Sequence, residues 1–222
     1  MEPRNYISEE MNNYLLSLTP DCWRWNRIHQ AIQLLQNEKL HIFIVGTENS
    51  VQTELLKFLA PSSGEYQANQ YSFDKPPIYY EDTYLCLWKV PSLGRLDFTH
   101  SYLASVIAST VYSTCKSSNL FIILLTFDSR RLGISYEEDF IKSLRIDFSG
   151  LCNNIDSHII TALSTDRLIS QDTRNEFISE TNKSLYHNLY LDTEIIPYCP
   201  DSRESCLELK AKLLIRSAAI YH

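Results

Sequence analysis

The segment GTENSVQT, residues 46–53, has the spacing in this chain that most resembles a phosphate-binding loop. Such a loop follows the pattern G-x-x-x-x-G-K-[ST] between a strand and a helix, and its lysine contacts the phosphates. Gly46 and Thr53 fit the first and last positions, whereas Val51 replaces the second glycine and Gln52 replaces the lysine. Valine adds a β-branched side chain where glycine lets the backbone wrap a phosphate, and glutamine lacks the charge. The segment keeps the ends of the motif without its phosphate-binding chemistry.

The rest of the chain shows no other catalytic or metal-binding arrangement. Its six cysteines stand singly, none in a C-x-x-C pair, and its six histidines lack metal-ligand spacing. No G-x-S-x-G segment marks a hydrolase nucleophile. We therefore expect no catalytic residue, no metal, no cofactor and no small-molecule substrate.

Composition indicates an acidic globular protein. The 222 residues are 44% hydrophobic and 21% charged, with a formal net charge of -7. There is no basic tract, so nucleic-acid binding has little support. No apolar run approaches the roughly 20 residues of a membrane-spanning helix, and the polar N-terminus lacks the apolar region of a signal peptide. We expect a soluble intracellular protein with reduced cysteines.

The candidate loop needs a strand before it and a helix after it, and the hydrophobic pattern predicts both. HIFIV is a short apolar strand of the kind covered on both faces, and VQTELLKFLA is a short helix. Helices and strands then alternate to the C-terminus, with NLFIILLTF as the central strand. The one departure is a pair of strand candidates between residues 71 and 90, the first confined to a sheet edge or broken by Pro76 and Pro77.

This order, β-α-β-β-α-β-α-β-α-β-α, predicts an α/β fold with a six-stranded, mostly parallel sheet and helices on both faces. Residues 40–222 are expected to form this domain, and residues 1–39 a helical extension. A capping box of Thr173 with Glu176 is expected to start one of the later helices.

From His41 nearly to the end, the order of elements resembles that of the Ras-like small GTPases. In that family an L-W-D-T-A-G-Q segment supplies an aspartate that helps hold Mg²⁺ and a glycine that senses the γ-phosphate. LWKVPSLGR, residues 87–95, places Lys89 at the aspartate and Ser92 at the glycine. The guanine-reading N-K-x-D element should follow SHIITALS, where Thr165 stands at the lysine and Arg167 at the aspartate. The resemblance implies a pseudo-GTPase, not an enzyme, whose phosphate, metal and base elements are all altered.

Within this class, several segments resemble the centromere protein M family of kinetochore pseudo-GTPases. They are IVGTENSVQTELLKFL, NLFIILLTFD, HIITALST, RNEFISETNKSLYHNLYLDTEIIPYC and CLELKAKLLIR. This resemblance implies a nuclear, structural subunit of the constitutive centromere-associated network, which supports kinetochore assembly and chromosome segregation. The implied partners are a helical-repeat subunit like centromere protein I, together with subunits like centromere proteins H and K.

Two alternatives stay open. A pseudo-GTPase adaptor similar to the dynein light intermediate chains would share the altered loop and would be cytoplasmic, although those chains continue into an effector-binding tail. An atypical GTPase-like protein would hold a nucleotide without the lysine.

Four residues are candidates for binding a partner protein: Trp23, Trp25, Arg130 and Arg131. Tryptophan is enriched at interface hot spots, and the two arginines follow the central strand at the end of the sheet where ligands bind in α/β folds. Each pair also has a structural explanation, which the sequence favours. The tryptophan helix would dock on the domain, and the arginines would lie in a solvated turn.

Overall fold

The computed structural model describes ten stretches of the chain, residues 39–47, 49–60, 76, 78–81, 85–95, 97–114, 120–128, 135–165, 170–200 and 202–221. Several sequence predictions lie outside these described residues. They are the helical extension up to residue 38 and the candidate residues Trp23, Trp25, Arg130, Arg131 and Arg167.

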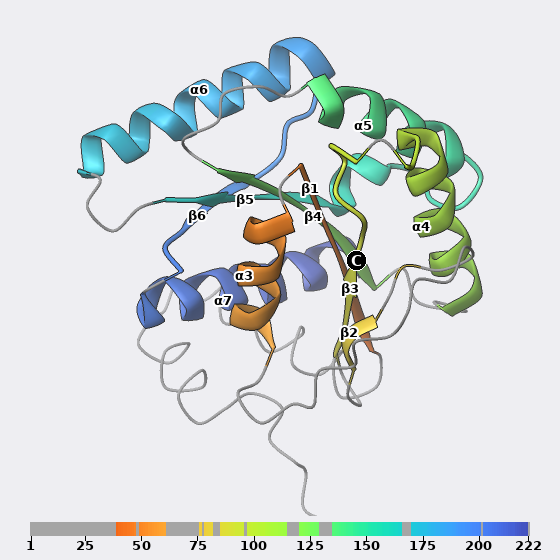
Figure 1. The fold of residues 1–222 in the computed structure, drawn as a ribbon, viewed down its shortest axis with the longest axis horizontal. Helices are drawn as coiled ribbons and strands as arrows, with labels where there is room; N and C mark the ends of the chain where they lie inside the picture. The colour runs from red at the N-terminus through yellow and green to blue at the C-terminus, as the bar shows by residue number, and fades with distance from the viewer. Residues whose placement is uncertain are drawn as a thin grey trace, which may run out of the picture.

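The described strands form one six-stranded sheet in the order β2-β3-β1-β4-β5-β6 (Figure 1). Five strands are parallel to one another: β1 (Leu40–Gly46), β3 (Leu85–Lys89), β4 (Phe121–Asp128), β5 (Ile159–Ser164) and β6 (Ile195–Tyr198). The remaining strand, β2 (Ile78–Glu81), pairs antiparallel with β3 at one edge. It begins directly after the two prolines, which an edge strand tolerates because its outer N–H groups need no partner. The predicted α/β fold and its element order are confirmed.

The helices cover both faces of the sheet (Figure 1). One face packs against α3 (Asn49–Leu59) and α7 (Arg203–Tyr221), and the other against α4 (His100–Thr114), α5 (Ser135–Asp147) and α6 (Gln171–Leu189). A short 3-10 turn, η1 (Ile155–His158), precedes β5. Within the described part of the chain, no helix has the length and apolar character to span a bilayer.

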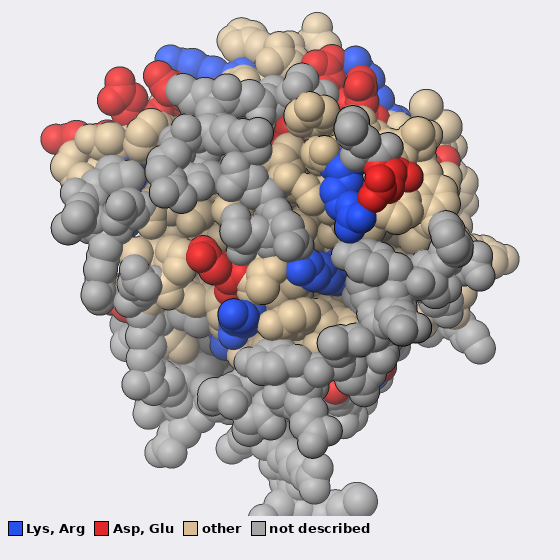
Figure 2. Space-filling view, in the orientation of Figure 1, with Lys and Arg blue, Asp and Glu red and all other residues tan. Residues whose placement is uncertain are grey.

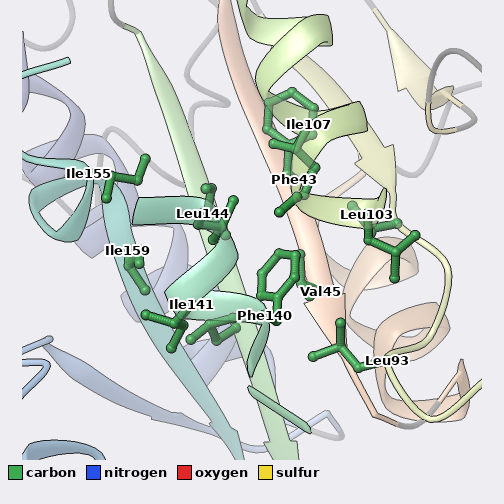
Figure 3. Close-up of a cluster of buried hydrophobic side chains, with 14 of the residues drawn as sticks. Phe43, Val45, Leu93, Leu103, Ile107, Phe140, Ile141, Leu144, Ile155 and Ile159 are labelled. Atoms are coloured by element: carbon green, nitrogen blue, oxygen red, sulfur yellow. The ribbon is translucent and has the colours of Figure 1, made fainter. Parts of the chain in front are cut away.

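The central strand β1 shows why the sequence pattern is apolar throughout. Side chains alternate along a strand, so Phe43 and Val45 join the core under α4, α5 and α6, whereas Ile42 and Ile44 join the core under α3 and α7. Figure 3 shows Phe43 and Val45 beside labelled side chains of α4 and α5. Because both faces are covered, no position of this strand is left for an exposed polar residue.

The start of α6 differs from the sequence prediction. The helix begins at Gln171, and Ser170 is its N-cap, since Ser170 Oγ accepts a hydrogen bond from the Thr173 N–H at 3.2 Å. The predicted capping box of Thr173 with Glu176 is therefore wrong. Thr173 already lies in the first turn, because the serine three residues earlier has the extended backbone of a cap.

The amino end of β1 holds a buried pair of polar side chains. The ring of His41 is 8% exposed, and its Nδ1 accepts a hydrogen bond from Trp88 Nε1 at 3.1 Å. Burial, with a smaller effect of the nearby Lys39 charge, lowers the pKa of His41 to about 4. The imidazole is thus neutral and carries its proton on Nε2. Trp88 also stacks on Phe43 at a centroid distance of 5.6 Å, so this pair is part of the core.

Candidate functional site

The carboxyl ends of β1 and β3 bring the predicted site residues together. β1 ends at Gly46, α3 begins at Asn49, and Lys89 at the end of β3 pairs with Ile44 of β1. In parallel α/β sheets, ligands bind at this end of the strands. Figure 2 shows Lys and Arg side chains, with Asp and Glu among them, in the middle of the face where Figure 1 draws α3 and β3.

Gly46 is required by the packing of β1 against β4. It pairs with Thr126, and a Cβ atom on Gly46 would lie 2.0 Å from Thr126 Oγ1 and 2.9 Å from the Thr126 carbonyl oxygen. Thr126 Oγ1 donates a hydrogen bond to the Val45 carbonyl at 3.1 Å, which fixes the hydroxyl in that position. Position 46 therefore has no room for a side chain, whatever the loop binds.

Gln52 is turned into the protein at the position of the expected lysine. Its side chain is 0% exposed, and Nε2 donates a hydrogen bond to the Gly46 carbonyl at 3.3 Å across the loop. Its Oε1 is buried and has no hydrogen-bond partner among the described residues. The neighbouring Val51 is also buried. These two positions supply no positive charge, and the polar group of Gln52 is directed to the loop's own backbone.

Lys89 supplies the cation of this site, and it contacts Thr53. The ammonium Nζ of Lys89 donates a hydrogen bond to Thr53 Oγ1 at 2.9 Å, across the gap between β3 and α3. Burial lowers the pKa of Lys89 from its ordinary value of 10.5, because it separates the ammonium from water. The lysine of the phosphate-loop motif is thus absent. Lys89 from the neighbouring strand instead bonds to Thr53, the last position of the motif.

The loop after β3 is bonded to the loop after β1 at two further points. Leu93 N–H donates to the Gly46 carbonyl at 2.9 Å, and Ser92 Oγ donates to the Thr47 carbonyl. Together with Lys89–Thr53, these contacts join the end of β3 and the loop after it to the end of β1, the loop after β1 and α3, and we call the three contacts the clasp. Gly94 lies against the same place, since a Cβ on it would be 3.4 Å from the Thr47 carbonyl oxygen.

One described residue of the segment expected to read a base, Thr165, is bonded to β6. Thr165 is buried, and its N–H donates to the Tyr198 carbonyl at 2.8 Å. Its Oγ1 donates to the same carbonyl at 3.2 Å. Its side chain therefore serves the sheet and is not directed to a ligand; Arg167 lies outside the described residues.

Comparison with known proteins gives the fold. Among the solved structures that the chain matches are two with TM-scores above one half. One is the LeoA bacterial dynamin GTPase from ETEC, at 15% identity and a TM-score of 0.52, covering 96% of this chain and 41% of LeoA. The other is a probable GTP-binding protein engB, at 16% identity and 0.51, covering 79% of this chain and 98% of engB. The fold is that of the P-loop GTPases. The chain thus spans less than half the length of LeoA, and no family model and no curated protein matches it.

Proteins of this fold hold Mg²⁺ with the Ser or Thr of the phosphate loop and an aspartate of a neighbouring strand. The residues at these positions here do not fit the ion. The Thr53 hydroxyl already accepts a hydrogen bond from an ammonium, and a divalent cation would be repelled by that charge. Among the described residues, no group of three or more His, Cys, Asp or Glu side chains could hold a metal elsewhere.

Sequence reasoning identified most of these positions but missed their contacts. It treated Lys89 as a departure from one motif and Thr53 as the retained last position of another, whereas the structure joins them in one hydrogen bond. A mostly parallel sheet was expected, but the pairing of β1 with β3, which places the end of β3 beside the loop after β1, was not. The bond from Gln52 to Gly46 had no signal in the sequence, because it depends on a side-chain rotamer inside the loop.

Proposed function

We propose that this chain is a pseudo-GTPase that does not bind or hydrolyse Mg²⁺-nucleotide and acts by binding other proteins. The observation that carries the proposal is the hydrogen bond from Lys89 Nζ to Thr53 Oγ1. This bond places the Lys89 ammonium at the hydroxyl that would otherwise coordinate Mg²⁺. Phosphoryl transfer needs that ion to bridge and neutralise the phosphates.

The glutamine of the loop supports the same proposal. A phosphate loop needs a lysine that reaches the β- and γ-phosphates, and Gln52 is neutral, buried and bonded to Gly46. Restoring a charge at position 52 alone would leave the ammonium of Lys89 in place of the metal. A GTPase scaffold without this chemistry keeps its surfaces, which can bind partner proteins.

A thermal-shift titration with GTP, GDP and ATP, each with and without Mg²⁺, tests the proposal. A site filled at one hundred times its dissociation constant would stabilise the fold by about 2.7 kcal/mol, which moves a midpoint by several degrees. We expect no shift with any nucleotide. A shift of several degrees at micromolar GTP would contradict the proposal and favour the atypical nucleotide-binding alternative.

At a finer level, we propose that the chain is a structural subunit of the inner kinetochore, in the nucleus. This step rests on the sequence resemblance to the centromere protein M family. The expected partners are the helical-repeat subunit like centromere protein I, with subunits like H and K. On this proposal the surfaces of the GTPase-like domain hold the assembly together.

Affinity purification of the tagged full chain from its own cells separates this proposal from the motor alternative. We expect centromere subunits in the purified material and loss of kinetochore assembly when the chain is depleted. Co-purification of dynein heavy chain without centromere subunits would instead support an adaptor like the dynein light intermediate chains. The two sets of companions are mutually exclusive.

A further inference from the structure

The loop between β3 and α4 is bonded at several points to elements that flank it. Besides the clasp, Val90 N–H extends the pairing of β3 by donating to the Ile44 carbonyl at 3.2 Å. On the other side, His100 Nε2 lies 3.0 Å from the Leu93 carbonyl. The β3–α4 loop is therefore bonded to β1, to the loop that follows β1 and to the first residue of α4.

None of these contacts needs a nucleotide or a metal. The acceptors in the clasp are the carbonyls of Gly46 and Thr47 and the hydroxyl of Thr53, and the donors belong to residues 89, 92 and 93. In switching GTPases the ordering of such loops depends on the γ-phosphate and its Mg²⁺, and hydrolysis releases them. Here the protein's own groups occupy both ends of every contact.

We propose that the clasp holds residues 90–95 of the β3–α4 loop permanently in one conformation, with Lys89 as the positioning residue that replaces the metal ion. The inference rests on the proposed function, since it assigns the loop's regulation to the protein itself. Lys89 bridges β3 and α3, so its ammonium fixes the start of the loop. The Ser92 and Leu93 bonds then fix its middle. A partner that binds this face meets the same surface at all times.

Hydrogen–deuterium exchange on the full chain tests the clasp, with the Leu93 amide as the reporter because it donates to Gly46. Lys89→Met keeps the length of the side chain and removes the ammonium. Hydrogen bonds to charged groups stabilise more than neutral ones, so we expect the Leu93 amide to exchange about tenfold faster in this variant. The Phe148 amide, which donates to Leu144 on α5, should exchange at the wild-type rate.

Lys57→Met is the matched control, because Lys57 is an exposed lysine in the last turn of α3. It should leave exchange at Leu93 unchanged. Lys89→Met should also leave the midpoint of global unfolding nearly unchanged, because burial disfavours the ammonium that it removes. If this variant does not fold, Ser92→Ala replaces it, since it removes only the hydroxyl bond to Thr47.

The outcomes distinguish the inference from the proposed function. Wild-type exchange at Leu93 in folded Lys89→Met would overturn the clasp, and so would wild-type exchange in Ser92→Ala where the first variant is unfolded. Neither result would touch the proposed function. Slower exchange of the wild-type loop on adding Mg²⁺-GTP would instead show that nucleotide orders the loop, which contradicts the proposed function.

Discussion

The two ends of β1 both hold buried polar groups, but they treat them differently. At the amino end, the His41 ring and the Trp88 N–H satisfy each other, and the imidazole is kept neutral. At the carboxyl end, the buried Gln52 Oε1 has no hydrogen-bond partner among the residues that the structure describes, and Lys89 keeps a partly buried ammonium. The first end is a polar detail of the core. The second lies at the end of the sheet where ligands bind in α/β folds, and its Gln52 amide and Lys89 ammonium donate to the protein itself.

This contrast follows from the fold. Sites in parallel α/β proteins form at the carboxyl ends of the strands, where loops leave backbone groups to be satisfied. At the amino end of β1 the backbone is paired, since the His41 N–H donates to the Leu120 carbonyl at 3.1 Å. At the carboxyl end of β1, the buried Gln52 oxygen without a partner among the described residues costs stability, and the fold tolerates this cost because it still requires the loop after β1.

The largest expected effect comes from Gly46→Ala, which tests whether the loop glycine is kept for packing. Its methyl group would overlap Thr126 Oγ1 at 2.0 Å, so we expect a loss of about 3 kcal/mol in the free energy of unfolding. Gly150→Ala is the control, since nothing lies within 4 Å of its added Cβ. Urea denaturation measures both. Equal stabilities of the two variants would show that position 46 is not constrained by packing.

A pH series tests the amino end of β1. The folded pKa of His41 is about 4, below its ordinary value of 6.5, so the unfolded chain binds more protons between these values. The His41 contribution to stability is therefore present above pH 6.5 and is lost as the pH falls through 4, by roughly 3 kcal/mol in total.

His41→Gln isolates this effect, because it keeps an acceptor for Trp88 and cannot titrate. Carboxylates titrate in both proteins, so the difference between their unfolding curves is the quantity to measure. The difference should change steadily between pH 6.5 and 4. Parallel curves across this window would mean that the histidine is not buried as a neutral ring.

A smaller effect is expected from Gln52→Met, which compares the two ends directly. It removes the bond to Gly46 but also a buried oxygen that has no partner in the described part of the chain, so the net change in unfolding free energy should stay within about 1 kcal/mol. The matched change at the other end, His41→Met, leaves the buried Trp88 N–H without an acceptor and should cost about 2 kcal/mol. A greater loss from Gln52→Met than from His41→Met would reverse the comparison.

The smallest effect concerns the ion pair beside His41. Lys39 Nζ lies 2.6 Å from Glu81 Oε1, and both side chains are partly exposed. Exposed pairs contribute little and are screened by salt, so Lys39→Met should change stability by less than about 0.5 kcal/mol. Unfolding in low and high salt measures this. A large, salt-dependent loss would mean that the amino end of the strand depends on charge as much as the carboxyl end does.

The sequence was sufficient for the order of the elements and for a six-stranded, mostly parallel sheet. Uninterrupted apolar runs such as HIFIV are typical of strands covered on both faces, and the prolines before β2 placed that strand at an edge. The start of α6 was missed by three residues, because Ser170 and Thr173 are both common cap residues and only Thr173 has a glutamate three positions later.

The position of the site could be predicted from the sequence, but the hydrogen bonds between its side chains could not. The altered residues Gln52, Lys89 and Ser92 were visible as departures from a motif. That Lys89 reaches Thr53, and that Gln52 turns to Gly46, depends on strand register and rotamers, which residue types alone do not specify. The pair of His41 and Trp88 was missed for the same reason.

Calorimetric titration of Mg²⁺-GTP into the wild-type chain is the most direct test of the claim that Lys89 and Gln52 have replaced the metal and nucleotide contacts. We predict no saturable heat at ligand concentrations up to about 1 mM, where any remaining affinity would be weaker than roughly 4 kcal/mol of binding free energy. Saturable one-to-one binding with a micromolar dissociation constant would contradict the claim.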